Sequence, residues 1–283
     1  MKALKMAGKW LVIISGIFVL FVVVSIVLSL HALKITEYEY KNKAITSPFT
    51  AVQLSDLHSH AFGKSNQRLI RKIADERPDV IFMTGDMLND DEESTSSIES
   101  LIRELKEIAP VYYSLGNHEL AYMKKDDQLV DKLKNAGATI LDQDYVDTEI
   151  CGQKVRIGGV YGYVLANGNQ DDTEQRFMKE FEDTEQLKIL LSHIPEGLLL
   201  WKSMEHWDVD LVFSGHVHGG QIRLPFVGGL FDPEEGYFPT YTKGIFECGN
   251  GTMILSAGLG SSQSIPRVNN IPEIVVCRCA GLS

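Results

Sequence analysis

The chain has 283 residues, of which 44% are hydrophobic and 23% are charged, and its net charge is −11. This composition is typical of a folded globular protein and excludes a wholly disordered chain. Six lysines and two glutamates lie within residues 1–43, which leaves 21 basic and 36 acidic residues beyond them and a charge there of about −15. Because non-specific binding of nucleic acid needs clustered basic side chains, we expect no nucleic-acid partner, whereas an acidic pocket could hold divalent cations.

A helix over residues 10–30 is the first predicted element. The 21 residues from Trp10 to Leu30 include no charged side chain. At about 1.5 Å per helical residue they can cross a hydrocarbon core of about 30 Å. No A-x-A-like cleavage site follows, so an uncleaved membrane anchor is favoured over a cleaved signal peptide. Residues 31–47 are predicted to form a polar tether, and residues 48–283 the folded domain.

Lysines flank the apolar segment on both sides. Three lysines in the short basic N-terminus, residues 1–9, favour an N-terminus inside the cell and an exported domain. Three more lysines between residues 34 and 43 weaken this bias. We predict a single-pass protein of the cell membrane whose folded domain lies outside the cytoplasm.

Strands and helices alternate in the first half of the domain. Strands are predicted at residues 49–54, 80–83 and 111–115, and helices at 66–77, 94–108 and 126–135. Asn66 is expected to cap the first of these helices. The acidic run 90–93 is interpreted as a solvated loop whose charges favour the start of the next helix. This βαβαβ order predicts a parallel sheet with helices packed over it.

Short strands dominate the second half of the domain. They are predicted at residues 139–141, 147–151, 155–161, 187–191, 210–213, 242–247, 253–257 and 273–279, with one helix at 171–181. Two strand-rich halves flanked by helices predict one α/β domain built on two packed β-sheets. The four cysteines lack the C-x-x-C spacing of zinc sites and are interpreted as buried free thiols, although an exported domain leaves a disulfide open.

Five of the predicted strands end in side chains that can bind metal ions. Asp56 and His58 follow the first strand, Asp86 the second, Asn117 and His118 the third, His193 a fourth, and His216 and His218 a fifth. In a parallel α/β sheet the carboxyl ends of the strands meet at one crevice, where ligands bind. We therefore expect these side chains to lie close together.

The stretch Gly215-His216-Val217-His218 is the densest part of this pattern. In extended backbone the two histidines would face the same side, with their roots about 6 to 7 Å apart. Paired metal ions about 3.5 to 4 Å apart could each take one imidazole. Taken alone, the stretch fits a polar loop with two unrelated histidines equally well, so the residues at the other strand ends favour the metal site.

These pieces, Asp-x-His, Gly-Asp, Gly-Asn-His-Glu, a lone His and Gly-His-x-His, occur in an order that resembles the calcineurin-like metallophosphoesterase superfamily. The resemblance covers essentially all of residues 49–279 and implies a four-layer α/β/β/α sandwich of two mixed β-sheets flanked by helices. It implies one metal ion held by Asp56, His58, Asp86 and His218, and a second held by Asp86, Asn117, His193 and His216. Asp86 would bridge the two ions, and His118 would be the catalytic histidine.

The donor chemistry agrees with that assignment. Asp, Asn and His donors suit divalent ions such as Mn, Fe or Zn, and the lack of cysteine donors disfavours a structural zinc site. Paired cations lower the pKa of a bridging water, so that a hydroxide forms near neutral pH and could attack phosphorus in line. His118 would donate a proton to the leaving oxygen or stabilise its charge.

Residues 219–231 follow the histidine pair and lie outside the motif set. Gln221 and Arg223 are candidates for binding the substrate phosphate, and a salt-bridged surface arginine is the alternative for Arg223. The apolar stretch 226–231 could accept an acyl chain or touch the bilayer, although ordinary core packing is favoured.

The N-terminal segment and the run His-Gly-Gly-Gln-Ile-Arg-Leu-Pro resemble the bacterial membrane-associated phosphodiesterase branch of the superfamily. Some relatives in that branch cleave the pyrophosphate of lipid-linked nucleotide sugars. The resemblance implies a membrane-anchored enzyme that hydrolyses a phosphodiester or pyrophosphate of a cell-envelope or lipid-linked substrate. The alternatives are a phosphomonoesterase, a nuclease, which the acidic domain disfavours, and a metal-free binding scaffold, which the complete motif set disfavours.

Overall fold

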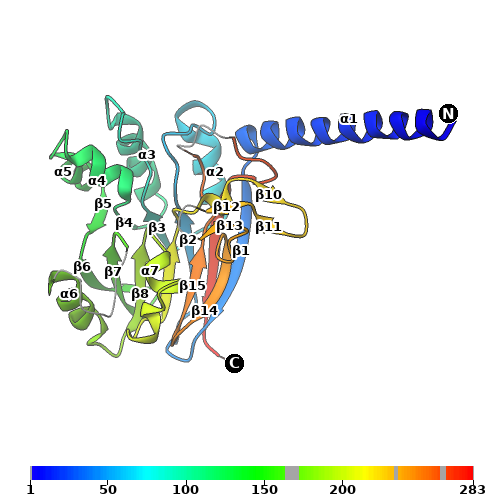
Figure 1. The fold of residues 1–283 in the computed structure, drawn as a ribbon. Helices are drawn as coiled ribbons and strands as arrows, with labels where there is room; N and C mark the ends of the chain where they lie inside the picture. Colours follow the sequence, from blue (N-terminus) through cyan, green and yellow to red (C-terminus); the bar gives the residue numbers. More distant parts are fainter. Residues whose placement is uncertain (1, 163–171, 233–234, 262–265, 283) are drawn as a thin grey trace.

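Figure 1 shows the computed structural model of the chain, which describes residues 2–162, 172–232, 235–261 and 266–282. A long N-terminal helix, α1 (Lys2–His31), projects from a body that contains two six-stranded β-sheets. The apolar part of α1 is long enough to cross a membrane over Lys5–His31, by length and composition. Large apolar side chains on this helix, such as Leu11 and Phe18, are exposed because the helix packs on the body only near its end.

The first sheet has the strand order β1-β16-β2-β3-β4-β5. Its strands are β1 (Lys34–Lys41), β2 (Phe49–Leu54), β3 (Val80–Thr84), β4 (Val111–Ser114), β5 (Ala138–Leu141) and β16 (Glu273–Ala280). Strands β2 to β5 are parallel, as are β1 and β16, whereas β16 and β2 are antiparallel. The parallel run confirms the predicted βαβαβ unit and extends it by one strand, β5.

The second sheet has the order β14-β15-β9-β8-β7-β6. Its strands are β6 (Asp144–Ile150), β7 (Gln153–Val160), β8 (Leu187–Ser192), β9 (Leu211–Ser214), β14 (Gly244–Cys248) and β15 (Gly251–Leu255). The four central strands, β15, β9, β8 and β7, are parallel, and an antiparallel strand pairs at each edge. Both sheets are therefore mixed, as expected.

Helices cover the outer face of each sheet, which gives the predicted four layers. They are α2 (Gln67–Asp75), α3 (Ser96–Lys106), α4 (Asn117–Met123), α5 (Leu129–Ala136), α6 (Asp172–Glu182) and α7 (Glu196–Leu199). Helices α2, α3 and α5 share an apolar core with the first sheet, and α6 and α7 with the second. Asp171, the predicted start of α6, lies outside the described residues.

Alternating side chains separate the apolar cores on the two faces of the first sheet. On β3, Val80 and Phe82 point between the sheets, whereas Ile81 and Met83 pack beneath the helices. Because successive side chains of a strand point to opposite faces, a strand buried on both faces must be apolar throughout. This explains the apolar run at the start of β3. Because the central strands of each sheet are parallel, their carboxyl ends lie at one edge of the sandwich.

The tether predicted over residues 31–47 is wrong for its central part, which forms the edge strand β1 and pairs along its whole length with β16. Tyr38 and Tyr40 pack into the core between the sheets, while Glu37 and Glu39 lie on the opposite face. The charged residues masked this period-two pattern in the sequence. The consequence is that only Ala32 and Leu33 separate α1 from the first sheet.

Three other local expectations need correction. Asn66 occupies the N-cap position of α2 as predicted, but its side chain does not cap the helix, because its Oδ1 accepts a hydrogen bond from the backbone N–H of Phe62. Cys277 and Cys279 are buried free thiols as expected, but Cys151 is exposed and Cys248 is half-buried. The stretch 226–231 does not pack into the core: it contributes to two small hairpins, β10 (Arg223–Leu224) with β11 (Gly228–Gly229) and β12 (Phe231–Asp232) with β13 (Gly236–Tyr237), and Phe226 is fully exposed.

Candidate metal centre

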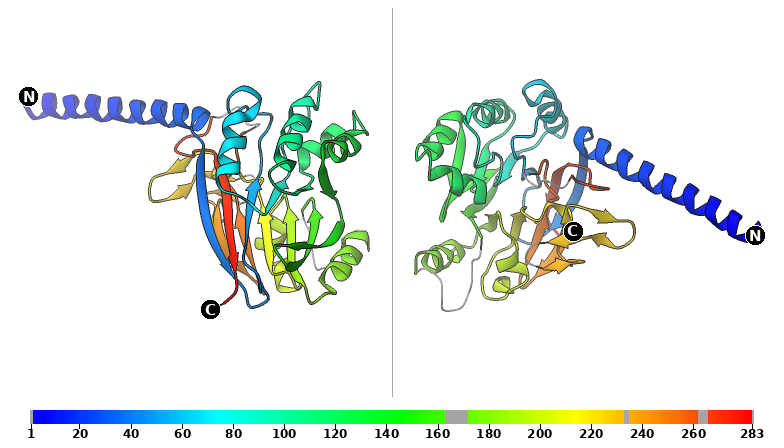
Figure 2. Two further views of the ribbon diagram at one scale, coloured as in Figure 1. Left: turned by 180° about the vertical axis from the view of Figure 1, so that it is seen from behind. Right: turned by 45° about the horizontal axis from the view of Figure 1, so that its top comes forward.

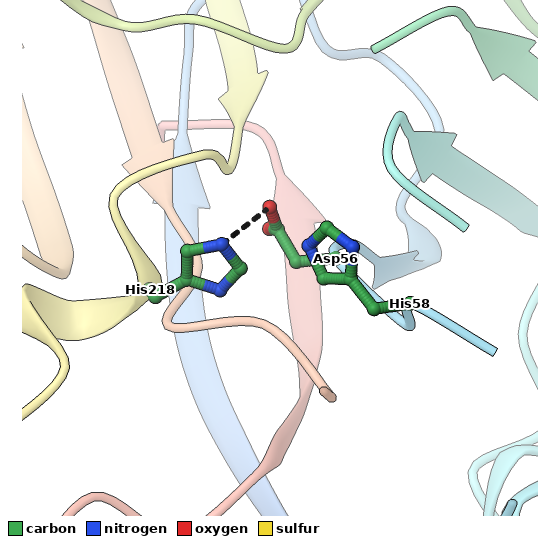
Figure 3. Close-up of side chains that lie close together, drawn as sticks. All are labelled: Asp56, His58 and His218. Atoms are coloured by element: carbon green, nitrogen blue, oxygen red, sulfur yellow. Dashed lines mark ion pairs between the residues drawn. The ribbon is translucent and has the colours of Figure 1, made fainter. Parts of the chain in front are cut away.

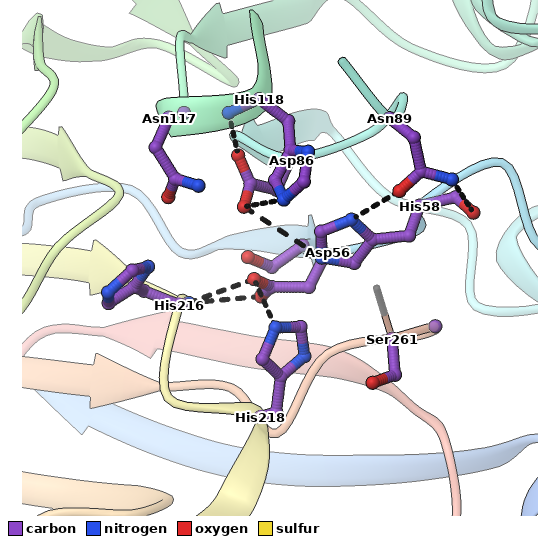
Figure 4. Close-up of polar contacts among 12 residues, drawn as sticks. Asp56, His58, Asp86, Asn89, Asn117, His118, His216, His218 and Ser261 are labelled. Carbon is purple, nitrogen blue, oxygen red and sulfur yellow. Dashed lines mark hydrogen bonds and ion pairs between the residues drawn. The ribbon is translucent and has the colours of Figure 1, made fainter. Parts of the chain in front are cut away.

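The eight side chains predicted for the site lie at the carboxyl ends of five strands. Asp56 and His58 follow β2, Asp86 follows β3, Asn117 and His118 follow β4, His193 follows β8, and His216 and His218 follow β9. Strands β2 to β4 belong to the first sheet, and β8 and β9 to the second. Figure 4 shows that most of these side chains point toward one another across the junction of the two sheets.

Asp and His side chains form three overlapping groups whose donor atoms lie within 4.8 Å of one another, close enough to share a metal ion. The groups are Asp56 with His58 and His218, His58 with Asp86 and His118, and Asp86 with His193 and His216. Figure 3 shows the first group, in which His218 Nε2 lies 3.9 Å from Asp56 Oδ1. Two groups contain Asp86, so this carboxylate lies where a bridging ligand would be needed.

The two histidines of the densest stretch join different groups, but not through extended backbone as the sequence suggested. His216 has φ 75° and His218 has φ 47°, and a short 3₁₀ turn begins at His218. His216 Nδ1 lies 3.3 Å from His193 Nε2, whereas His218 faces Asp56. A left-handed turn, not strand alternation, therefore separates the two imidazoles.

Positive φ angles are common among the candidate ligands. Besides the two histidines of the turn, Asp56, His58 and Asp86 have φ between 46° and 53°. This conformation is unfavourable for residues with a Cβ and persists only where the surroundings enforce it. The surroundings here are tight: a Cβ on Gly215 would lie 1.8 Å from Ser55 Oγ, and one on Gly116 would lie 2.3 Å from Asp86 Oδ1.

Hydrogen bonds on the outer side of two rings fix which nitrogen faces the site. Asn89 Nδ2 donates to the His58 carbonyl, so Asn89 Oδ1 is turned to accept a hydrogen bond from His58 Nδ1 at 3.0 Å. His193 Nδ1 donates to the Thr84 carbonyl at 2.8 Å. In both cases Nε2 is left to face the site, which is the arrangement that metal-binding histidines adopt.

Glu119 holds the backbone around Asp86 in place. Its buried carboxylate accepts hydrogen bonds from the backbone N–H groups of Asp86, Met87 and Gly116, and from the hydroxyl of Tyr113, each at 2.8 Å. Burial and the nearby Asp86 raise the pKa of Glu119. Glu119 completes the Gly-Asn-His-Glu motif as a structural residue, a role that the sequence did not assign.

Burial keeps three of the site imidazoles neutral. It lowers the pKa of His58 to about 4 and that of His216 to about 3, and it lowers the pKa of His218 well below its usual value. Burial also raises the pKa of Asp56 to about 6. A neutral imidazole has the lone pair that a divalent cation needs, and a cation beside Asp56 would favour its ionised form.

His193 and Asp86 behave as an ion pair. Burial opposes a charge on His193, but Asp86 outweighs it and raises the pKa of His193 to about 10. Burial likewise raises the pKa of Asp86, but His193 and His58 outweigh it and hold that pKa below its usual range. Asp86 Oδ2 lies 3.3 Å from His193 Nε2 and 3.8 Å from His58 Nε2, so it attracts positive charge from both sides.

His118 occupies the rim of this cluster. Its side chain is 18% exposed, its Nδ1 lies 3.0 Å from Asp90 Oδ1, and its Nε2 lies 4.0 Å from Asp86 Oδ2. The sequence interpretation of residues 90–93 as a simple solvated loop is therefore incomplete, because Asp90 orients the His118 ring. Asn117, the adjacent residue, points its Oδ1 to within 3.1 Å of His193 Nε2.

The two candidate substrate-binding residues make contacts within the protein. Arg223 Nη1 donates to the Gly219 carbonyl and to Thr242 Oγ1, and thereby braces the turn after His218. Gln221 pairs with Ser261 Oγ. A third polar residue, Arg267, is buried and places Nη2 3.3 Å from His218 Nδ1. Arg267 has no motif context in the sequence, so only the fold reveals it.

Comparison with known proteins identifies relatives over most of the chain. The calcineurin-like phosphoesterase family matches residues 49–220. The uncharacterized metallophosphoesterase YkuE of Bacillus subtilis is 29% identical over 255 residues, covering 87% of this chain and 85% of the relative. Phosphodiesterase YaeI of Escherichia coli is 27% identical over 234 residues, covering 81% of this chain and 82% of the relative.

Among solved structures, a dimetal phosphatase from Danio rerio is similar, with a TM-score of 0.47 and 12% identity over 75% of this chain and 88% of that chain. The family match covers more than half of the chain and includes every strand end that contributes to the site. The chain therefore belongs to the calcineurin-like phosphoesterase family and is a metal-dependent phosphoester hydrolase.

Proposed function

We propose that the protein is a membrane-anchored hydrolase of phosphodiester or pyrophosphate bonds that uses two divalent metal ions. The observation that carries this proposal is that Asp86 belongs to two of the three groups of potential ligands, one with His58 and His118 and one with His193 and His216. The remaining group, Asp56 with His58 and His218, shares His58 with the first of these, and Asn117 lies beside His193 of the second.

The residues present fit such ions. Nε2 of His58 is buried and has no hydrogen-bond partner among the described residues, whereas its Nδ1 bonds to Asn89, so Nε2 lacks the partner that a buried polar atom requires. The donors are oxygen and imidazole nitrogen, which suits Mn, Fe or Zn. Two ions held by these residues would supply a hydroxide nucleophile near neutral pH and neutralise charge on the phosphoryl oxygens.

His118 is the residue we assign to proton transfer. Its side chain is 18% exposed, whereas those of His58 and His193 are fully buried, and Asp90 contacts the ring on the side away from Asp86. In this position Nε2 can donate a proton to the leaving oxygen of a bound phosphoester, provided that the ring is protonated at both nitrogens. Asp90 contacts Nδ1 on the other side of the ring, through its backbone N–H at 3.2 Å and its Oδ1 at 3.0 Å.

Two observations support a membrane-bound diester or pyrophosphate as substrate. The similarity to the phosphodiesterase YaeI favours diester chemistry over monoester chemistry. The exposed apolar face of α1 favours an anchor that holds the site close to lipid-linked substrates of the cell envelope. A monoesterase and a nuclease are the alternatives, and the negative charge of the body disfavours the nuclease.

The experiment is a substrate panel with the full chain in detergent, after chelation and readdition of Mn, Fe, Zn or Mg. The panel contains p-nitrophenyl phosphate, bis(p-nitrophenyl) phosphate, a nucleotide-sugar lipid and single-stranded DNA. We expect metal-dependent hydrolysis of the diester and of the lipid pyrophosphate. Preference for the monoester or for DNA would contradict the proposed substrate class, and metal-independent hydrolysis would contradict the proposed chemistry.

A further inference from the structure

The β10–β11 hairpin carries an exposed apolar tip, formed by Leu224, Phe226 and Val227. Their exposed fractions are 37%, 109% and 62%. Leu224 pairs with Gly228 at the end of the two-stranded ladder, so Phe226 and Val227 lie in the turn that joins the two strands. Phe226 also has a φ of 66°, a conformation that bulky residues rarely adopt. Exposed side chains of this kind usually mark an interaction surface.

The neighbouring β12–β13 hairpin adds three exposed aromatic side chains. Phe231 and Tyr237 form an edge-to-face pair with ring centroids 5.3 Å apart, and the backbone N–H of Phe238 donates to the Leu230 carbonyl. Their exposed fractions range from 45% to 74%. We call this set the apolar rim, and it consists of Leu224, Phe226, Val227, Phe231, Tyr237 and Phe238.

The apolar rim is fixed relative to the candidate membrane helix. The backbone of Arg223 bonds to Val268, and Asn269 Nδ2 donates to the Arg223 carbonyl. The next residue, Asn270, accepts a hydrogen bond from Ser29 Oγ in the last turn of α1. A chain of direct contacts therefore joins the hairpin to the end of the helix. All views in Figures 1 and 2 show the β10–β11 hairpin projecting from the body on the same side as α1.

The contact at Ser29 sets the depth of the body. The uncharged run of α1 continues to Leu30, and Leu28 and Leu30 are about half exposed. Ser29 is one residue from the end of this run. If the run lies in the hydrocarbon core, the segment that contacts Ser29 must therefore lie at the membrane surface. The hairpin that packs on this segment then lies at the same level. Aromatic side chains are the residues that favour this interface.

We propose that the apolar rim is a second membrane contact, which inserts Phe226 and Val227 into the outer part of the bilayer beside α1. This inference rests on the proposed anchor. The base of the hairpin also packs against the short turn His218–Gly220 of the candidate metal centre, since a Cβ on Gly220 would lie 2.7 Å from Gly229 Cα. Insertion would therefore hold the metal centre at the level of the lipid head groups, where the phosphoester of a lipid-linked substrate lies.

The test uses the full chain reconstituted into vesicles of phosphatidylcholine and phosphatidylglycerol. Phe226→Cys, in a Cys151→Ser, Cys248→Ser background, is labelled with the environment-sensitive fluorophore NBD. The matched control is Lys179→Cys, an exposed residue on α6, which all views place on the side of the body away from α1. Vesicles with and without doxyl-labelled phosphatidylcholine show whether lipid chains contact the fluorophore.

We expect NBD at position 226 to emit at shorter wavelength than NBD at position 179, and doxyl lipid to quench it selectively. Emission typical of water, or a shift without quenching by doxyl lipid, would overturn the proposal, and the second result would indicate contact with another protein copy. The double variant Phe226→Asp, Val227→Asp should keep its rate on soluble bis(p-nitrophenyl) phosphate, because neither residue lies in the metal centre. Loss of that rate would show that the hairpin has a structural role instead.

Failure of the underlying proposals would look different. If alkaline carbonate released the unlabelled chain from the vesicles, the anchor would be wrong, and this inference with it. If the unlabelled chain were inert toward every ester tested, the proposed catalysis would be wrong, although the fluorescence result would still stand.

Discussion

At the scale of single residues, the candidate metal centre is held in place by surrounding groups that are not themselves candidate metal ligands. Asn89 and the Thr84 carbonyl select the ring nitrogens of His58 and His193 that face inward. Glu119 holds the backbone of Asp86, and Asp90 orients His118. Such outer partners typically tune metal affinity or activity by about 10- to 100-fold.

His118 gives a prediction that separates proton transfer from metal binding. We expect His118→Ala to keep the metal content of the wild-type chain and to lose about 100-fold or more in kcat on an alkyl phosphodiester, whose leaving group needs a proton. The loss should be smaller on bis(p-nitrophenyl) phosphate, because nitrophenolate leaves without protonation. His206→Ala, which changes an exposed histidine outside the motif set, is the control. Equal losses on both esters would argue against the assigned role.

At the scale of elements, strand β1 is held to the rest of the first sheet by a buried polar cluster around Glu273. This carboxylate accepts hydrogen bonds from Thr36 and Lys243 and pairs with Lys34, and it also receives the backbone N–H of Ala257. Burial raises the pKa of Glu273, but Lys243 and Lys34 outweigh it and bring that pKa to about 2. The cluster therefore joins the segment after α1 to both the first and the second sheet.

Glu273→Gln should lower the free energy of unfolding by roughly 3 kcal/mol at pH 7, because it leaves Lys243, whose side chain is only 19% exposed, without its counter-charge. The pKa of Glu273 is lower in the folded chain than its ordinary 4.5. Its charge therefore stabilises the fold above about pH 4.5, and this contribution is lost as the pH falls toward 2. Denaturant unfolding of both chains in detergent, at pH 7 and at pH 3, measures the difference.

We expect that difference to shrink at the lower pH. Glu39→Gln, which changes an exposed acidic residue on the neighbouring strand β1, is the control and should cost less than about 1 kcal/mol. If the difference in free energy of unfolding between wild type and Glu273→Gln were the same at pH 7 and pH 3, the charge of the carboxylate would not be what stabilises the fold.

The sequence was sufficient for most elements because their signals are local. Apolar runs such as residues 80–83 and the polar residues after them predicted both the strands and their convergence. Strand β1 was missed because its alternating tyrosines lie among charged residues, and its pairing with β16 joins residues more than 200 positions apart. Helix α4 was missed because it begins inside the Gly-Asn-His-Glu motif and has only seven residues.

In the candidate site too, local sequence predicts some features, whereas others depend on contacts between distant residues. Its eight predicted side chains lie together because each follows a strand, which local sequence reveals. The left-handed turn at His216 and His218 and the buried Arg267 depend on tertiary contacts. Asp90 was interpreted as a solvated residue because nothing in its acidic surroundings indicates the His118 ring beside it.

At the scale of the whole molecule, α1 and the catalytic body are closely coupled. The helix ends at His31 and β1 begins at Lys34, so the connection is too short to act as a flexible tether. If α1 crosses the membrane, the body must stay at the bilayer surface with a restricted orientation. This geometry suits substrates that are themselves confined to the membrane.

The anchor can be tested directly in cells. We expect the full chain to remain in the membrane fraction after alkaline carbonate treatment, because transfer of an apolar helix of this length into water is strongly unfavourable. Replacing Val19 and Val23 with Asp, in the middle of the apolar run, should release the chain. Soluble wild-type protein with a new N-terminus near residue 30 would show that the segment is a cleaved signal peptide.

The most direct test of the central claim is to measure bound metal and hydrolysis together in wild-type protein and in Asp86→Asn. Metal is counted by mass spectrometry, hydrolysis is followed with bis(p-nitrophenyl) phosphate, and Asp131→Asn, an exposed residue on α5, is the control. If Asp86 bridges two ions, wild type and the control should bind two divalent ions per chain, and Asp86→Asn should lose both metal and rate while remaining folded. Full metal content and full rate in Asp86→Asn would contradict the account.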